Sequence, residues 1–264
     1  ADVRRMLLTQ KAIAEGGRAM IYAAAQTADL MVDAARRQDR ATQDKHDDTL
    51  GFYTPILKGF LTEMGLEAAN LGMQVFGGHG YIREHGMEQI ARDARIATLY
   101  EGTTGIQALD LLGRKGLLGT RGKCVRDFSR IMLRSAKAHW LAHGSIGRMA
   151  RSTARRAIEW NLLTLRIMRR VGKDRDLVGS ASVDYLMYSG YVMMAHFWVR
   201  QAAVAQTFLR NGKGAESAEF YRAKIQTAEF YFDRLLPRAD AHRKSALAPT
   251  RSLMQMGNGD FAFS

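Results

Sequence analysis

The sequence contains little that cross-links or interrupts a chain: its 264 residues include one cysteine, Cys124, and three prolines. A single cysteine cannot close a disulfide within the chain, which excludes a disulfide-stapled secreted scaffold and fits a reducing compartment. Runs of Val, Ile and Thr that favour strands are scarce, whereas Ala, Leu, Met, Arg and Gln, which favour helices, are abundant. We therefore expect an all-α protein located in the cytoplasm.

Long hydrophobic runs are also missing. The longest, Tyr191–Val199, has about half the length of a membrane span and contains His196. Acidic residues are outnumbered, because 39 Lys and Arg against 26 Asp and Glu give a net charge of +13. This excess favours an anionic partner, such as nucleic acid, anionic lipid or a phosphate-rich ligand, unless it serves solubility alone. We expect at most a peripheral attachment to membranes.

Apolar residues at three- and four-residue spacings predict a helical bundle in the first part of the chain. The first helix should end near the charged patch Arg36–Asp48, and the second should open at Thr54–Pro55, because proline suits the first turn of a helix. The second helix should stop at the glycine turn Gly77–Gly80. The four expected helices are Val3–Val32, Thr54–Val75, Met87–Leu99 and Thr103–Leu112.

The glycine- and base-rich stretch Gly113–Lys123 predicts a domain boundary. Beyond it, a second bundle is expected from the helical runs Val125–His143, Ile146–Val171, Ser182–Asn211 and Ala215–Leu236. The last residues contain two of the three prolines and favour an extended tail. We therefore predict one helical bundle over 1–116, an additional helical bundle over 117–236 and an extended tail over 237–264.

A lone carboxylate, Glu101, follows the uncharged run Ile96–Tyr100 and precedes Gly102. One interpretation is structural: an acid at the start of a helix favours the positive end of that helix. The other is a general base, because a carboxylate shielded from water has a raised pKa and removes protons near neutral pH. Gly102 then leaves room for a substrate. The second interpretation requires Glu101 to be shielded, free of ion pairs and close to the glycine turn.

The glycine turn Gly77–Gly80 also allows two interpretations. It either reverses the chain between two helices or offers exposed backbone N–H groups to an anion such as a pyrophosphate. His79 lies within it, without a second His, Cys or acid at metal-ligand spacing. We therefore expect no metal site.

The order and spacing of these elements are more specific than any one of them. Over Gln74–Gln107, Gln-x-x-Gly-Gly-x-Gly-Tyr is followed by Arg-Asp and then by Tyr-Glu-Gly-Thr with Ile-Gln behind it. This pattern resembles the C-terminal helical domain of the acyl-CoA dehydrogenases, and the resemblance extends over about residues 3–115. The whole chain resembles the C-terminal portion of a long member, in which a further helical domain follows a four-helix bundle.

The resemblance implies an FAD-dependent enzyme of fatty-acid β-oxidation that converts an acyl-CoA to the trans-2-enoyl-CoA. Glu101 would remove the α-proton, and its backbone N–H would help to hold the thioester carbonyl. Tyr100 and Gly102 would border the substrate. The residues that the resemblance implies as FAD contacts are Gln74, Val75, Phe76, Gly77, Gly78, Thr103 and Gly105. Those from Gln74 to Gly78 would reach an FAD that is held mainly by a neighbouring subunit.

Two further expectations follow from the resemblance. Many members have glutamine where this chain has Gly105, so only backbone atoms could serve at that position. The family also needs an N-terminal helical domain and a middle β-domain to form its flavin and acyl pockets. This chain alone should therefore neither hold FAD tightly nor catalyse the reaction. Electron-transfer flavoprotein is the expected electron acceptor, and a homodimer is the expected assembly.

The basic run Arg148–Arg170 leaves an alternative open. It is either a solvated helix face, an attachment site for an anionic membrane surface, or a DNA-binding element. The alternative to an enzyme is therefore a non-catalytic or DNA-binding relative of the family that uses this basic helical region.

Overall fold

The computed structural model of the chain describes residues 1–212 and 214–262, apart from the side chains of residues 117 and 118. Within these ranges every regular element is a helix and none is a strand. The all-α prediction is therefore confirmed.

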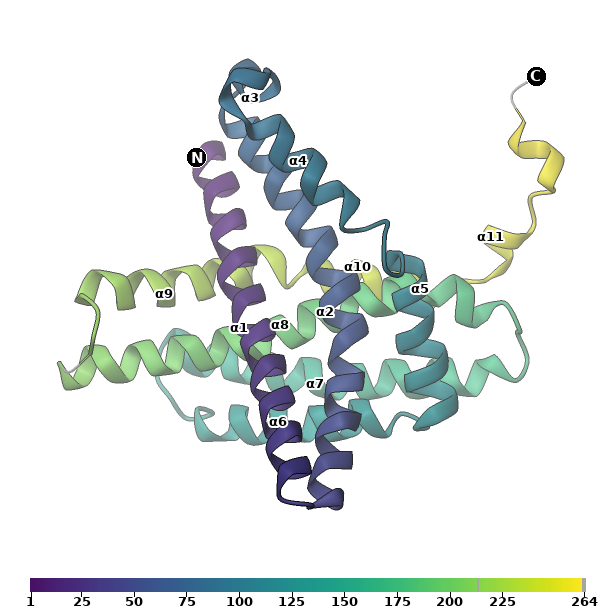
Figure 1. Cartoon of the computed structure of the whole chain (residues 1–264), viewed down its shortest axis with the longest axis horizontal. Helices are drawn as coiled ribbons and strands as arrows, with labels where there is room; N and C mark the ends of the chain where they lie inside the picture. Colours follow the sequence, from purple (N-terminus) through teal and green to yellow (C-terminus); the bar gives the residue numbers. More distant parts are fainter. Residues whose placement is uncertain (213, 263–264) are drawn as a thin grey trace.

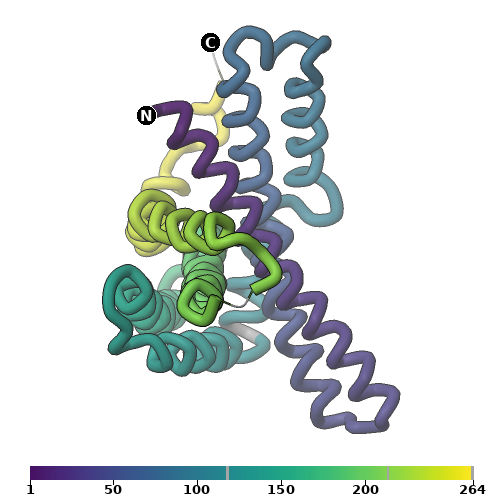
Figure 2. The backbone as a smooth tube through the Cα atoms, turned by 90° about the vertical axis from the view of Figure 1, so that its left-hand side faces the viewer, coloured from purple at the N-terminus to yellow at the C-terminus, as the bar shows by residue number. Residues whose placement is uncertain are grey.

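The first part of the chain is built on a long antiparallel hairpin of two helices, α1 (Asp2–Arg36) and α2 (Arg40–Val75) (Figure 1). The tip of this hairpin projects beyond the rest of the molecule (Figure 2). At its other end the chain reverses, and a helix then returns along α2. The elements that follow the reversal are α3 (Gly78–Tyr81), the 3₁₀ helix η1 (Arg83–His85), α4 (Met87–Ile96), α5 (Thr104–Leu109) and the π-helix η2 (Asp110–Gly119).

The second part lies across the hairpin, with its long helices nearly perpendicular to α1 and α2 in Figure 1. Its centre is α8, in which every residue from Tyr185 to Val199 is buried. A helix that is apolar on all sides belongs in a core. No helix in the described ranges is both long and apolar enough to cross a membrane. The elements of this part are α6 (Lys123–Ala138), α7 (Ser145–Val171), α8 (Leu177–Asn211), α9 (Ala218–Phe230), the π-helix η3 (Tyr231–Leu235) and α10 (Arg238–Ser245).

A continuous hydrophobic core joins the two parts. The ring centroids of Phe60 on α2 and Tyr191 on α8 lie 4.9 Å apart, in an edge-to-face arrangement. Beside them, Gly190 allows the close approach of α8, because a Cβ at this position would lie 2.1 Å from Cγ of Phe60. Trp198 Nε1 also donates a hydrogen bond to the carbonyl oxygen of Ala12, at 3.3 Å. The predicted bundles therefore pack as neighbours that share their interior.

The expected start of the second helix at Thr54–Pro55 is wrong. Helix α2 begins at Arg40, where the Asp39 side chain caps the helix by accepting a hydrogen bond from the backbone N–H of Thr42 at 3.0 Å. Pro55 lies inside the helix, which continues although this residue lacks an N–H. The charged patch Arg36–Asp48 forms the solvent-exposed end of the hairpin, where α1 ends and α2 begins.

The stretch Gly113–Lys123 contains less of a break than its glycines suggest. The helix that begins with α5 continues through the wider π-helical turns of η2 and ends at Gly119. The chain then turns at Arg121 and Gly122, which have φ of +47° and +76°. The expected extended tail also begins differently, because α10 follows Pro237 directly and buries Ala239 and Ala246. The segment after Thr250, with α11 (Arg251–Met254) and the 3₁₀ helix η4 (Asn258–Phe261), leaves the body of the molecule (Figure 1), whereas Thr250 itself donates a hydrogen bond to Asp174 at 2.6 Å.

Candidate functional site

Glu101 lies in the turn between α4 and α5, and its backbone is unusual. Its φ is +52°, and Gly102 follows with a φ of +93°. A left-handed conformation at a residue other than glycine costs about 1–2 kcal/mol. Such a residue persists only where its surroundings hold it in place, and strained positions of this kind cluster at functional sites.

Lys58, on α2, contacts the first half of this turn. Its Nζ donates a hydrogen bond to the carbonyl oxygen of Ala97, the residue that caps α4 at its C-terminus. The same ammonium lies 5.2 Å from the centre of the Tyr100 ring, within the range of a cation–π contact. One side chain thus fixes both the exit from α4 and the aromatic residue that precedes Glu101.

Two further side chains contact the second half of the turn. Gln107 Nε2 donates to the carbonyl oxygen of Glu101 at 3.4 Å, and a Cβ at Gly102 would lie 2.5 Å from the same nitrogen. Glu63 Oε1 accepts a hydrogen bond from Thr104 Oγ1 at 2.5 Å. The φ of Gly102 therefore favours glycine at this position, and the Gln107 amide packs against it.

The Glu101 side chain is exposed and forms no ion pair with the residues that the structure describes. Its backbone N–H likewise donates to none of them. The expected shielding from water is wrong for this chain by itself, because Leu99 and Tyr100 are 48% and 51% exposed. The acid and the apolar side chains around it form an open surface that lacks a cover.

The glycine turn lies near the other end of α4, before its first residue Met87. Gly77 has a φ of +60°, and no atom lies within 4 Å of a Cβ built on Gly77 or on Gly78. Gly80 is needed for packing, because its Cβ would lie 2.2 Å from the carbonyl oxygen of Met73. Gln74, Phe76, Gly77 and Gly78 are exposed, and Val75 is half-buried. No three His, Cys, Asp or Glu side chains in the described part of the chain are grouped to hold a metal ion.

The structure does not bring Glu101 close to the glycine turn, and this expectation is wrong. The two lie at opposite ends of α4, whose ten residues span about 15 Å (Figure 1). The predicted site residues therefore form two groups. Tyr100, Glu101, Gly102, Thr103 and Gly105 lie at one end of α4, and the stretch from Gln74 to Gly78 lies at the other.

Thr103 and Gly105 differ in how they are engaged. Thr103 caps α5, because its hydroxyl oxygen accepts a hydrogen bond from the backbone N–H of Ile106 at 3.4 Å. A Cβ on Gly105 would touch only this hydroxyl, at 3.9 Å. The backbone of Gly105 is therefore open to an approaching group.

A groove of about 730 Å³ is lined by Gln74 from one group and by neighbours of the other group. It follows one face of α2 from Gln74, beside the glycine turn, to Glu63 and Thr104, beside the turn of Glu101. Met187 of α8 contributes to its wall. Sequence reasoning missed Lys58 and Glu63, because their contacts with the turn join residues 39 and 41 positions apart.

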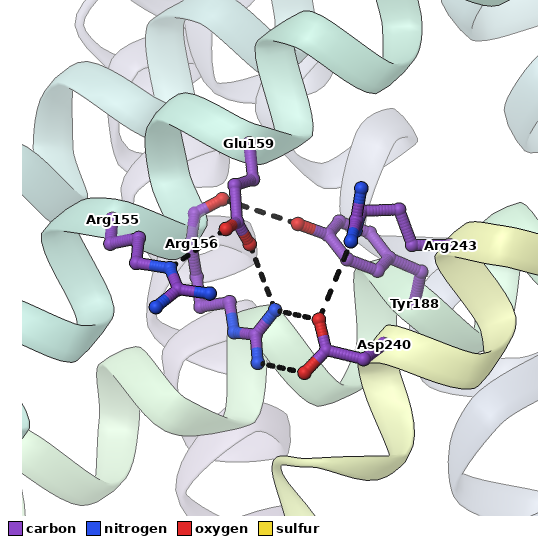
Figure 3. Close-up of polar contacts among 6 residues, drawn as sticks. All are labelled: Arg155, Arg156, Glu159, Tyr188, Asp240 and Arg243. Atoms are coloured by element: carbon purple, nitrogen blue, oxygen red, sulfur yellow. Dashed lines mark hydrogen bonds and ion pairs between the residues drawn. The ribbon is translucent and has the colours of Figure 1, made fainter.

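Several arginines of the basic run Arg148–Arg170 have partners within the chain, and Figure 3 shows two of them, Arg155 and Arg156. Arg156, whose side chain is 8% exposed, donates to both oxygens of Asp240 at 2.6 and 2.7 Å and to Glu159 at 2.8 Å. The hydrogen bonds from Arg156 lower the pKa of Asp240 below its ordinary value. Arg155 also pairs with Glu159, at 2.8 Å.

Other arginines of this run contact neighbouring elements. Arg148 pairs with Asp233, and Arg170 donates to the carbonyl oxygen of Leu247 at 2.9 Å. Several of the positive charges that suggested an anionic partner therefore have partners inside the molecule. Fewer of them are available to a membrane or a nucleic acid than the sequence suggests.

Comparisons with known proteins match most of the chain. Residues 1–117 match the family model "Acyl-CoA dehydrogenase, C-terminal domain", and residues 126–257 match "Acetyl-CoA dehydrogenase C-terminal like". The 3-methylmercaptopropionyl-CoA dehydrogenase of Ruegeria pomeroyi is 35% identical over 91% of this chain and 40% of its own length. The broad-specificity linear acyl-CoA dehydrogenase FadE5 of Mycobacterium tuberculosis is 29% identical over 98% of this chain and 43% of its own length.

A solved structure shares the fold. The acyl-CoA dehydrogenase of Bacillus anthracis, crystallised in complex with FAD, superposes with a TM-score of 0.68 at 16% sequence identity. The match covers 97% of this chain and 42% of the other. The chain thus spans about 40% of the length of the relatives reported above.

Proposed function

The chain belongs to the acyl-CoA dehydrogenase family, and from this premise we propose that it is the C-terminal helical part of an FAD-dependent acyl-CoA dehydrogenase. The proposed reaction converts an acyl-CoA to the trans-2-enoyl-CoA, as in fatty-acid β-oxidation, with Glu101 as the base. The observation that carries the proposal is the strained turn at Glu101. There a carboxylate without an ionic partner among the described residues is held in a left-handed conformation beside a glycine.

The residues at both ends of α4 fit the proposed cofactor. Gly77 and Gly78 present open backbone, which suits a bulky phosphate group. Because α4 separates this stretch from Glu101, the glycine turn would hold the FAD of the partner subunit in a homodimer, together with Gln74, Val75 and Phe76. Thr103 and the backbone of Gly105 would contact the cofactor beside Glu101. FAD, when bound, supplies the acceptor for the hydride that leaves the β-carbon.

Glu101 would act through two of its groups. Its carboxylate accepts the proton from the α-carbon of the acyl group, which is a general-base role. Its backbone N–H, which has no acceptor among the described residues, donates to the thioester oxygen on which negative charge develops. Tyr100 and Gly102 border the thioester. The other domains of the enzyme must supply the cover that excludes water, and electron-transfer flavoprotein is the proposed electron acceptor.

The test is the substitution Glu101→Gln in the full-length enzyme. We expect the rate of flavin reduction by acyl-CoA to fall by a factor of about 10²–10⁴, because the amide cannot take the proton. The FAD content and the circular dichroism spectrum should stay unchanged. The matched control is Glu84→Gln, which removes an exposed glutamate between the glycine turn and α4. A Glu101→Gln enzyme that reduces its flavin at the normal rate would show that another group is the base.

A further inference from the structure

The turn that carries Glu101 is fastened at both ends by side chains from a single helix. Lys58 and Glu63 lie five residues apart on α2, and both are half-buried. Lys58 contacts the start of the turn at Ala97, and Glu63 contacts its end at Thr104. We propose that Lys58 and Glu63 are positioning residues that fix the orientation of Glu101, an inference that rests on the role proposed above for this residue.

Lys58 contacts the C-terminal end of α4, where a cation is favourable. The last carbonyl groups of α4 have no partner within the helix, and a cation near a helix C-terminus is also favoured by the helix dipole. Its ammonium satisfies one of these groups at Ala97 and lies over the ring of Tyr100. Removing it would release both the exit from α4 and the residue that precedes Glu101.

The contact of Glu63 fixes the start of the next helix. Thr104 is the first residue of α5, and its hydroxyl donates to the Glu63 carboxylate at 2.5 Å. Hydrogen bonds to an ionised acceptor are shorter and stronger than those between neutral groups.

The middle of the turn has its own restraint. Gln107 reaches back from α5 to the carbonyl oxygen of Glu101 and packs against Gly102. Because α2 is a continuous helix, its residues 58 and 63 are held about 7.5 Å apart along the helix axis. Helix α2 therefore fixes the distance between the two side chains that hold the ends of the turn. Glu101, between those ends, is held by Gln107 from α5.

This arrangement matters for the proposed reaction because proton transfer needs the base within hydrogen-bonding reach of the α-carbon. A displacement of about 1 Å can lower a rate by about 10²-fold. The carboxylate and N–H of Glu101 must also act on the same substrate at the same time. Loosening either end of the turn would change the orientation of both groups without removing either.

The kinetic test uses Lys58→Met and Glu63→Leu in the full-length enzyme, because neither replacement can form the hydrogen bond of the original side chain. We expect kcat to fall about 10–100-fold in each variant, with KM for acyl-CoA changing far less, because orientation rather than substrate binding is lost. Lys58→Arg should recover most of the rate, since a guanidinium can donate to the same carbonyl. The control is Lys45→Met, which removes an exposed lysine from the same helix and should leave both constants unchanged.

A second readout does not depend on catalysis. Amide hydrogen exchange of residues 97–104 should become faster in Lys58→Met and in Glu63→Leu, and it should not change in Lys45→Met. If Lys58→Met does not fold, Glu63→Leu alone provides the test. Unchanged exchange and unchanged kcat in a folded variant would overturn the positioning role, whatever Glu101 does. Faster exchange together with a fully active Glu101→Gln enzyme would instead overturn the proposed base and support only the anchoring of the turn.

Discussion

The turn around Glu101 and the cluster around Arg156 both join distant segments of the chain through charged side chains, but they use charge in opposite ways. At Arg156 an almost buried guanidinium is matched by two carboxylates, and the result ties α10 to α7 (Figure 3). At the turn, the charged residues Lys58 and Glu63 bind backbone and hydroxyl groups, and the central acid is left without an ionic partner among the described residues.

The difference indicates what each region is for. A paired and desolvated charge must be matched by its neighbours, and it stabilises one arrangement of the helices. An acid that is held in place by its backbone keeps its carboxylate available for a reaction. Changes in the Arg156 cluster should therefore affect mainly stability, and changes at the turn should affect mainly the rate. The predictions below test this division.

The largest effect on stability is expected for Arg156→Met. Removing the guanidinium leaves the Asp240 carboxylate and one oxygen of Glu159 without their donor in a largely buried site. We expect the free energy of unfolding to fall by about 3 kcal/mol, the low end for a broken buried ion pair, because Asp240 is partly exposed and can be rehydrated. Urea denaturation followed by circular dichroism measures the change.

Arg155→Met is the matched control for this variant. Arg155 is adjacent in sequence and pairs with the same Glu159, but its side chain is 70% exposed. Exposed ion pairs contribute about 0–1 kcal/mol, so this substitution should change the stability little. Equal losses in the two variants would contradict the view that burial gives the Arg156 cluster its strength.

A smaller loss is expected where the two regions meet. Helix α2 carries Lys58 and Glu63, helix α8 carries Tyr188 of the Arg156 cluster, and the two helices touch at Phe60 and Gly190. In Gly190→Ala the new methyl group would lie 2.1 Å from the Phe60 ring, so the ring or a helix must shift. We expect a loss of about 2 kcal/mol in urea denaturation.

Gly179→Ala controls for helix propensity on the same helix. No atom lies within 4 Å of a Cβ at Gly179, so this substitution should be neutral or raise the stability by less than about 1 kcal/mol. If both alanine variants were equally stable, the close approach of α2 and α8 at Gly190 would be of no energetic consequence.

The comparison also shows which features could be predicted from the sequence. Helices with a continuous apolar face were predicted well: the run Ile146–Val171 corresponds to α7, Ser145–Val171, and the run Met87–Leu99 to α4, Met87–Ile96. The first fourteen residues of α2, before Thr54, were missed. They are charged and carry little apolar periodicity, and Pro55 resembled a helix start. Helix propensity and apolar periodicity do not reveal a solvent-exposed helix start that is fixed by a capping side chain, as Asp39 fixes the start of α2.

For both the turn at Glu101 and the Arg156 cluster, the sequence predicts local features better than contacts between distant residues. The position of Glu101 in a turn before Gly102 is a local feature, so the sequence motif located it. The contacts that decide its environment are not local. Nothing in the sequence distinguishes Lys58, which contacts the turn, from the exposed Lys45 on the same helix, and nothing pairs Arg156 with Asp240, 84 residues later. These contacts depend on how the helices pack.

The smallest expected effect is the dependence of stability on pH through Asp240. The hydrogen bonds from Arg156 hold the pKa of Asp240 below its ordinary value of 3.8, so the unfolded chain takes up this proton at a higher pH than the folded protein does. The contribution of Asp240 is therefore complete above pH 3.8 and is lost as the pH falls through the lower pKa of the folded state. The stability difference between the wild type and Asp240→Asn should be constant well above pH 3.8 and should shrink as the pH falls below this value. In an Arg156→Met background the same difference should depend on pH much less, because the main cause of the lowered pKa is gone and only the weaker attraction of Arg243 and Arg155 remains. If the gap stays constant with pH in the wild-type background, Arg156 does not hold Asp240 in its charged form, and the contrast with the unpaired Glu101 loses its electrostatic basis.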